Sequence, residues 1–410
     1  PVWHFDLYRL EHSGEIYELG IEEAFDHAIC LIEWPENMAG NEPSDWLEMR
    51  LYPGESETSR YAAFHPHGTR ARELLRCLAS RDAERGGDID KFLAAAGWSG
   101  AARAPLAGDA SARRYLRLTR GGDSAVLTDS EQVDIAAFCR IARHLDGLGY
   151  SAPKIYAEDS TRRLLLLEDM GDHSFTHCLE DGGGPSGEAL YSAAVDLLTA
   201  LASAPVAAAG APAMDAAYLA AEIRLFAEWW PPEGGGESEL KAHADGWAAA
   251  WCEAHVLALA MPQCLSLRDF HAANLMWLPE RQGIARVGLL DFQDAVAAPL
   301  PYDLVSLLQD VRRDVPGDLE AEMIARFLGA FPELDREAFR ASYAILGAHR
   351  NLRIAGVFSR LAGRDGKRCY LAYLPRVWRH IDADLRHPAL APVADWLARF
   401  VPPGERESGQ

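Results

Sequence analysis

Residues 265–293, LSLRDFHAANLMWLPERQGIARVGLLDFQ, contain three short apolar runs. The first two flank a polar loop that carries Asp269, His271 and Asn274, and the third ends abruptly at Asp291. Two carboxylates and one carboxamide therefore follow strand-like segments, where a loop can direct them into a cleft. Such oxygen ligands suit a hydroxyl group and a divalent cation held near a phosphate chain.

The composition limits the partners that the protein can have. At 410 residues the chain is long enough for two or three domains with their own cores. Its formal charge of −21 repels phosphate backbones and anionic lipid, so we expect neither nucleic acid nor a membrane as a direct partner. No apolar run approaches the roughly 20 residues that cross a bilayer, no signal-peptide pattern is present, and the seven cysteines form no C-x-x-C pair. These features predict a cytoplasmic protein with reduced thiols.

The first 53 residues have the pattern of a small α/β piece. Strand-like runs at Val2–Leu10, Ala28–Trp34 and Trp46–Leu51 accompany a turn and helix at Ser13–Phe25. This piece resembles the C-terminal half of the TsaE family, the small P-loop ATPases that support threonylcarbamoyl modification of tRNA. The matching stretches are HFDLYRL (4–10), ELGIEE (18–23) and LIEWPE (31–36).

The TsaE resemblance implies that Asp6, Glu33 and Trp34 lie beside a nucleotide and Mg²⁺. The family's phosphate-binding G-x-x-x-x-G-K-[ST] loop is absent from the sequence, and we expect it upstream of Pro1 in a longer protein. Without that loop the piece is predicted not to hydrolyse ATP by itself. It is either an inert, truncated remnant of a fusion or a docking piece for tRNA-modification partners.

A linker and a small sheet domain are predicted next. Residues 54–88 mix Gly, Ser, Glu, Pro and Arg, which favours a linker with one short helix around Ala71–Ser80. From Ile89 to Glu168 the expected order is hairpin, strand, helix, strand, strand. This order predicts a five-stranded antiparallel sheet with one helix, which we place at Glu131–Leu145.

The tip of the hairpin is a candidate phosphate site. It consists of small or turn-forming residues between two apolar runs: Gly108, Asp109, Ala110 and Ser111. The backbone amides of such a tip can cover phosphates, and Arg113 and Arg114 add positive charge. An ordinary turn explains the same small residues.

The motif Glu168–Gly171 (EDMG) follows the most apolar strand and is predicted to connect the sheet to a helical lobe at 169–400, with a disordered tail at 401–410. Backbone groups around Glu168 and Met170 would bind adenine. Apolar periodicity predicts the helices of this lobe at 186–204, 215–230, 237–260, 302–313, 319–331, 336–362, 367–386 and 393–400.

A small sheet, a connecting segment and a helical lobe that carries D-x-x-x-x-N and then D-F form the arrangement of the protein-kinase-like superfamily. We therefore expect an α+β, two-lobed kinase-like fold preceded by the partial P-loop α/β domain. In this arrangement Asp269 would accept or orient the proton of a substrate hydroxyl. Asn274 and Asp291 would hold Mg²⁺ that bridges the ATP phosphates.

Two further residues are expected to support the loop. The ring of His271 would bond to the backbone, since no Cys or carboxylate is arranged with it as a catalytic triad. Asp303, in the YDL motif, would accept hydrogen bonds from the loop, with Arg268 as its partner.

From about Ile89 to Phe400 the chain resembles the aminoglycoside-phosphotransferase-like kinases. It is most similar to the cell-wall-recycling sugar kinases (AmgK type) that phosphorylate N-acetylmuramate and N-acetylglucosamine at the C1 hydroxyl. The matching stretches are GDASARRYLRL (108–118), AEIRLFAEWW (221–230), RDFHAANLMWLPER (268–281), GLLDFQDAV (288–296), YDLVSLLQDVRRDV (302–315) and RDGKRCYL (364–371). The resemblance gives Asp269, Asn274 and Asp291 the same roles. It also implies that Glu222, Glu228 and Trp229 line a sugar site, although core packing explains that helix equally well.

The sequence departs from the wider superfamily at one point. The strand that usually carries a phosphate-binding Lys has the sequence AVLTDS (125–130), with Asp129 near the position of that Lys. We therefore assign the phosphate contact to Arg113 or Arg114.

These features predict an ATP- and Mg²⁺-dependent kinase of a small-molecule substrate, an N-acetylated amino sugar. Two alternatives remain open. One is a kinase of another small alcohol, such as an aminoglycoside or a choline-like substrate. The other is a non-catalytic scaffold linked to the tRNA-modification machinery.

Overall fold

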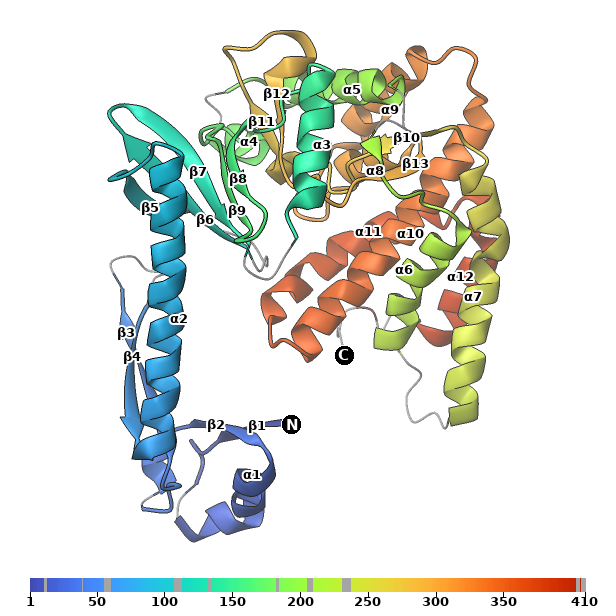
Figure 1. The fold of residues 1–410 in the computed structure, drawn as a ribbon. Helices are drawn as coiled ribbons and strands as arrows, with labels where there is room; N and C mark the ends of the chain where they lie inside the picture. The colour runs from blue at the N-terminus through green and yellow to red at the C-terminus, as the bar shows by residue number, and fades with distance from the viewer. Residues whose placement is uncertain are drawn as a thin grey trace. The chain divides into compact units, whose positions relative to one another are not determined.

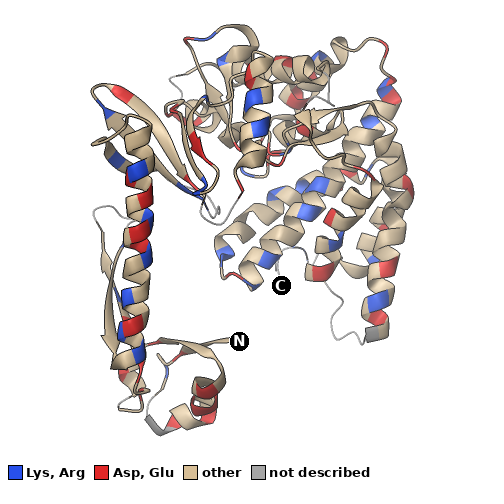
Figure 2. Cartoon of the chain, viewed as in Figure 1, with Lys and Arg blue, Asp and Glu red and all other residues tan. Residues whose placement is uncertain are grey.

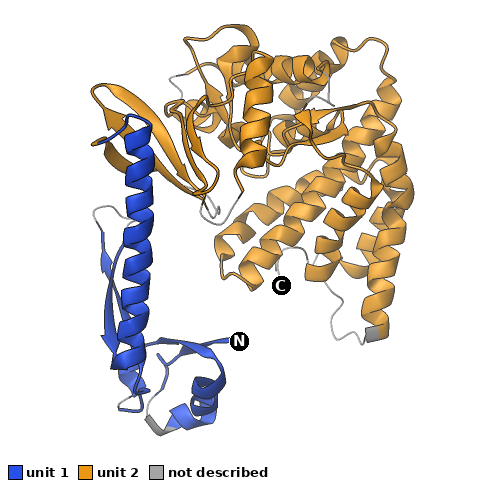
Figure 3. Ribbon diagram, viewed as in Figure 1, with its two compact units in different colours: residues 1–99 blue, residues 100–410 orange. Residues whose placement is uncertain are grey.

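The computed structural model describes residues 1–10, 13–38, 40–54, 60–106, 113–130, 134–181, 184–204, 209–230, 237–402 and 406. The chain forms two compact units, residues 1–99 and residues 100–410 (Figure 3). Within the described ranges, every helix is too short or too polar to cross a bilayer.

The first unit begins with a βαβ arrangement. Strands β1 (Val2–Asp6) and β2 (Ile29–Glu33) pair in parallel and are joined through a 3₁₀ helix η1 (Ser13–Leu19) and helix α1 (Ile21–His27). A small core holds these elements and η2 (Pro35–Met38) together, and its buried side chains are Phe5, Leu7, Ile16, Ile21, Ala24 and Met38. The strands predicted from the alternating apolar residues are therefore present.

The expected linker at 54–88 is wrong. Strand β3 (Trp46–Pro53) pairs with a second strand, β4 (Arg60–His67), and helix α2 (Gly68–Ala95) follows directly. The predicted short helix at Ala71–Ser80 is the middle of this longer helix. Its full length was not predicted because it contains Gly86-Gly87 and many charged residues, and only four of its side chains are buried, at Ala71, Ile89, Phe92 and Leu93. So sparse an apolar stripe leaves little helical periodicity in the sequence.

The second unit starts with the predicted five-stranded antiparallel sheet, which is confirmed. Its strand order is β5-β6-β7-β9-β8 (Figure 1). The strands are β5 (Ala102–Leu106), β6 (Arg114–Arg120), β7 (Asp123–Asp129), β8 (Ile155–Asp159) and β9 (Leu164–Glu168). Helix α3 (Ala136–Gly147) packs on one face, where a buried cluster joins Ile135, Cys139, Leu165 and Leu167.

The rest of this unit is mainly helical, as predicted. Its helices are α4 (Phe175–Asp181), α5 (Gly187–Ala202), α6 (Ala216–Trp229), α7 (Glu237–Leu259), α8 (Tyr302–Leu308), α9 (Gly317–Gly329), α10 (Arg336–Gly363), α11 (Leu374–Asp384) and α12 (Ala391–Phe400). Helix α8 ends five residues earlier than expected. The carboxylate of Asp310 accepts a hydrogen bond from the backbone N–H of Arg312 at 2.9 Å, a local turn that competes with the helix.

Helices α6 and α10 form the centre of the helical lobe. The apolar residues Leu219, Ile223 and Phe226 of α6 are buried, and so is Trp230 at its C-terminal cap. Gly356 of α10 lies against the backbone of α6, since a Cβ atom there would meet the Leu225 carbonyl at 3.0 Å. The two helices can approach this closely only because position 356 has no side chain.

Three ties join the small lobe and the segment after it to a second hairpin, formed by β11 (Leu275–Trp277) and β12 (Val287–Leu289). Ser151 accepts a backbone hydrogen bond from Leu289 at 2.8 Å and donates from its hydroxyl to the Ala285 carbonyl. Trp277 N donates to the His173 carbonyl at 2.7 Å. An ion pair between Glu168 and Arg281 completes the set.

Candidate active site

The β11–β12 hairpin brings Asn274 and Asp291 together. Leu275 lies opposite Leu289, and Leu290 N donates to the Asn274 carbonyl at 3.0 Å. Asn274 directly precedes β11, and Asp291 follows Leu290. The strand register therefore places the carboxamide and the carboxylate at the same end of the hairpin.

An aromatic pair holds the segment that carries Asp291. Phe292 is fully buried and stacks on Phe138 of α3, with ring centroids 4.9 Å apart. Asp291 is thereby anchored to the helix of the small lobe.

Both candidate metal ligands offer oxygen atoms. Asn274 Nδ2 donates to the Asp269 carbonyl at 2.9 Å, which leaves Oδ1 of the amide for a cation. The Asp291 side chain is 46% exposed, and Gln293 Nε2 donates to its Oδ1 at 2.8 Å. Such residues fit Mg²⁺, which is commonly bound by one or two protein groups together with substrate phosphates.

The charges around Asp291 also favour a cation. Desolvation by the surrounding protein raises the pKa of Asp291, although part of the side chain still reaches solvent. The hydrogen bond from Gln293 opposes this rise, the neighbouring carboxylate of Asp269 adds to it, and Arg113 opposes it. A divalent cation beside Asp291 would relieve the repulsion between the two acids.

The loop that carries Asp269 has an unusual backbone. Arg268, directly before Asp269, has φ +67°, and Asp291 has φ +56°. A left-handed conformation at residues other than glycine costs about 1–3 kcal/mol each and persists only where surrounding contacts impose it. Such residues cluster at functional sites, which fits this loop.

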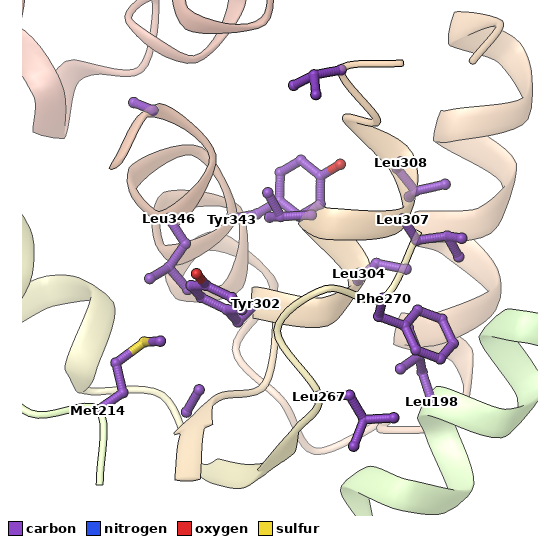
Figure 4. Close-up of a cluster of buried hydrophobic side chains, with 14 of the residues drawn as sticks. Leu198, Met214, Leu267, Phe270, Tyr302, Leu304, Leu307, Leu308, Tyr343 and Leu346 are labelled. Carbon is purple, nitrogen blue, oxygen red and sulfur yellow. The ribbon is translucent and has the colours of Figure 1, made fainter. Parts of the chain in front are cut away.

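Asp303 of α8 supplies those contacts. Its Oδ1 accepts from Ser266 Oγ at 2.6 Å and from Arg268 N at 2.9 Å, and its Oδ2 accepts from Leu267 N at 2.7 Å. Ser306 Oγ donates to the Arg268 carbonyl as well. Burial raises the pKa of Asp303 to about 6, against the opposing effect of these hydrogen bonds. Figure 4 shows the apolar floor of the same loop, with Phe270 beside the leucines of α8.

The expected partnership of Arg268 with Asp303 is only partly right. The backbone N–H of Arg268 binds Asp303, but its guanidinium extends to α6, where Nη2 lies 2.5 Å from Glu222 Oε1. The same oxygen of Glu222 lies 3.1 Å from Arg353 Nε on α10. A charged cluster of α6 and α10 thus stands beside the residue that precedes Asp269.

The two candidate phosphate arginines have different partners. Arg113 directly precedes β6, and Arg114 is the first residue of that strand. Arg114 lies opposite Asp129 in the β6–β7 register, and Nη2 is 2.9 Å from Asp129 Oδ2. Arg113 is 10% exposed, and its Nη1 lies 3.9 Å from Asp291 Oδ1. Of the two, only Arg113 is positioned beside Asp291. Gly108, Asp109, Ala110 and Ser111 lie outside the described residues.

The connecting segment is held from both sides. Arg117 of β6 pairs with Asp169 and Asp172, at 2.8 Å in both cases. The sulfur of Met170 lies over β12, 2.9 Å from the position of a Cβ on Gly288. The side chain of Glu168 pairs with Arg281, and its backbone N–H donates to the Lys154 carbonyl at 2.9 Å.

The three α6 residues proposed for a sugar site diverge. Glu222 joins the catalytic loop through Arg268. Glu228 is exposed and pairs with Arg224 at 3.3 Å. Trp229 is partly buried against the core of the helical lobe and close to Gly363.

His271 is buried beside Asn274. Its Nε2 lies 3.4 Å from Asn274 Nδ2 and 3.2 Å from Arg312 Nη1. Because both neighbours are donors, Nε2 accepts, which places the ring proton on Nδ1. The sequence suggested backbone partners for this ring, whereas these two contacts are with side chains.

Sequence reasoning missed the arginines of α10. Arg350 and Arg353 are three residues apart and therefore lie on one face of the helix. The sequence does contain a pattern that could have indicated them, since charged residues recur at helical spacing inside an apolar stretch. The same pattern, however, equally fits a helix face exposed to solvent.

In the first unit the three predicted residues also meet. Asp6 lies opposite Glu33 at the ends of two parallel strands, and His4 Nε2 lies 3.0 Å from Glu33 Oε1. Trp34 has φ +57°, and its ring centroid lies 5.0 Å from that of Tyr8.

Comparisons with known proteins agree with both units. Residues 103–341 match the model of the phosphotransferase enzyme family, and residues 1–61 match that of threonylcarbamoyl adenosine biosynthesis protein TsaE. An N-acetylmuramate/N-acetylglucosamine kinase of Caulobacter vibrioides is 38% identical over 348 residues, which cover 76% of this chain and 95% of that protein.

Two further matches concern the first unit and the fold. The TsaE protein of Rickettsia bellii is 46% identical over 50 residues, 12% of this chain and 35% of that protein. A crystal structure of a choline/ethanolamine kinase family protein from Mesorhizobium loti aligns with a TM-score of 0.51 at 15% identity, covering 78% of this chain and 99% of that one. The last likeness concerns the fold alone.

Proposed function

Because the chain belongs to the phosphotransferase enzyme family, we propose that it transfers the γ-phosphoryl group of ATP to the C1 hydroxyl of N-acetylmuramate or N-acetylglucosamine, in the cytoplasm. The observation that carries this proposal is the convergence of Asp269, Asn274 and Asp291 at one end of the β11–β12 hairpin. The amino-sugar substrate is inferred from the relative of 38% identity.

The proposed mechanism assigns one task to each group. Asp269 accepts the proton of the C1 hydroxyl as that oxygen bonds to the γ-phosphorus and ADP leaves. Asn274 Oδ1 and the Asp291 carboxylate would hold Mg²⁺, which would supply positive charge for the phosphates. Asp303 holds the strained backbone before Asp269, and Arg113 supplies the positive charge that a strand Lys gives in related folds.

Release of ADP tests the substrate assignment. The full chain is incubated with Mg-ATP and, separately, with N-acetylmuramate, N-acetylglucosamine, choline and an aminoglycoside. We expect turnover with the amino sugars. Turnover with choline or the aminoglycoside alone would replace our proposal with the rival kinase activity.

A single substitution separates a kinase from a scaffold. We expect Asp269→Asn to lower kcat by about 10²–10⁴-fold while ATP still binds, because only the proton acceptor is lost. A scaffold would not respond to this change. The same variant without sugar tests the first unit, since we propose that this unit does not hydrolyse ATP by itself and therefore expect no ADP release.

A further inference from the structure

An arginine pair on α10 stands beside the proposed catalytic loop. Arg353 Nε and Arg268 Nη2 share one oxygen of Glu222, and Arg268 directly precedes Asp269. Arg350 lies one helical turn before Arg353 on the same face. In Figure 4, Leu346, one further turn back, lies beside Tyr302 of α8 and behind the loop. Figure 2 shows basic residues, all of them Arg, recurring along α10.

Arg350 is the unusual member of the pair. Its residue is only 4% exposed, and within the described part of the chain its guanidinium makes no hydrogen bond or ion pair. Burial lowers the pKa of Arg350, whereas Tyr302, Asp269 and Asp310 raise it from nearby. An arginine stays charged in proteins, so a buried and unpaired guanidinium is unfavourable until an anion reaches it.

Glu222 is not that anion in the structure. Its Oε1 is shared by Arg268 and Arg353, and neither of its carboxylate oxygens is bonded to Arg350 among the described residues. Arg376 of α11 pairs with Asp314. Arg313 also has a buried Nη1 atom without a hydrogen bond among the described residues, but Arg350 is the arginine that interacts electrostatically with Asp269.

The two proposed sugars differ by one anionic group. N-acetylmuramate carries a lactyl ether with a carboxylate on C3, two ring carbons from the reacting C1, and N-acetylglucosamine has a hydroxyl there. Guanidinium groups bind carboxylates through two parallel hydrogen bonds, which makes arginine well suited to recognise this difference.

We infer that Arg350, assisted by Arg353, binds the lactyl carboxylate of N-acetylmuramate while the C1 hydroxyl lies at Asp269. This inference rests on the proposed function and assigns its anionic substrate a binding residue. The transferred phosphoryl group is the other anion that could reach Arg350. Arg113 already lies at the metal end of the site, and a phosphoryl contact would serve both sugars equally.

The test compares the two sugars in the same variant. For Arg350→Gln we expect kcat/KM for N-acetylmuramate to fall about 10- to 100-fold, the loss of a charged hydrogen-bond pair, while N-acetylglucosamine changes less than about threefold. Arg340→Gln, which removes an exposed guanidinium from the start of the same helix, is the matched control and should alter neither value. Equal losses with both sugars would overturn the inference and indicate a phosphoryl contact.

A second measurement needs no variant. The wild-type protein is assayed with the methyl ester of N-acetylmuramate, which keeps the lactyl ether but loses its charge. We expect a fall in kcat/KM similar to that of Arg350→Gln with the acid, and an unchanged value would refute the role of the carboxylate. If the wild type phosphorylates neither sugar, the proposed function fails. If it phosphorylates both and the ester behaves like the acid, only the inference about Arg350 fails.

Discussion

Replacing Phe292 with leucine tests whether the small lobe positions the metal end of the site. Phe292 is fully buried, directly follows Asp291 and stacks on Phe138 at 4.9 Å. The substitution removes roughly three carbon atoms at about 0.8 kcal/mol each and an aromatic pair worth about 0.5–1.5 kcal/mol. We therefore expect the free energy of unfolding to fall by about 3 kcal/mol. Because Asp291 then loses its anchor, the Mg²⁺ concentration for half-maximal activity should rise.

A matched core substitution separates the two effects. Phe327 of α9 is also buried, and its ring lies 5.1 Å from Phe331 and 5.8 Å from Phe339, away from the loop. Phe327→Leu should cost a similar unfolding free energy by chemical denaturation but leave the Mg²⁺ dependence of ADP release unchanged. If both variants show the wild-type Mg²⁺ dependence, the stack does not position Asp291 and the reasoning is wrong.

Three further predictions concern single positions. The pKa of Asp303 is about 6 in the fold and about 3.9 in an unfolded chain. Its contribution to the free energy of unfolding is therefore fully present below pH 4 and is lost as the pH rises to about 6, a change of about 3 kcal/mol. Denaturation of Asp303→Asn at both pH values should no longer show this change. Arg113→Ala should raise the KM for ATP, whereas Arg114→Ala should leave it unchanged, and the opposite ranking in initial-rate measurements would exclude Arg113 as the phosphate contact. Gly356→Ala should lower the melting temperature, because its Cβ would lie 3.0 Å from the Leu225 backbone, and overpacking of this kind costs about 1–3 kcal/mol; an unchanged or higher melting temperature would mean that α6 can yield.

The convergence of Asp269, Asn274 and Asp291 could be predicted because it depends on local pattern. Apolar runs define β11 and β12, and the residues next to paired strand ends must meet once the strands pair. The helices followed from their periodicity for the same reason. Helix α2 did not, since its apolar stripe is sparse and two glycines interrupt it.

The side-chain partners could not be predicted, because they depend on tertiary placement. Asp303 was expected to bind the loop, but the sequence does not say that Arg268 would offer its backbone there and its guanidinium to Glu222. The choice between Arg113 and Arg114 likewise depends on which of them the fold brings to Asp291. Arg350 could be identified only from the structure, because its burial and its lack of a hydrogen-bond partner among the described residues depend on tertiary packing.

The ties at Ser151, His173 and Glu168 have a mechanical consequence. Parting the small lobe from the β11–β12 hairpin would break three hydrogen bonds and an ion pair. At about 0.5–1.5 kcal/mol for each hydrogen bond, an open state along this seam would cost about 2–5 kcal/mol and hold only a few per cent of the molecules or fewer. The small lobe, the hairpin and its two oxygen ligands therefore behave as one rigid block in nearly all molecules.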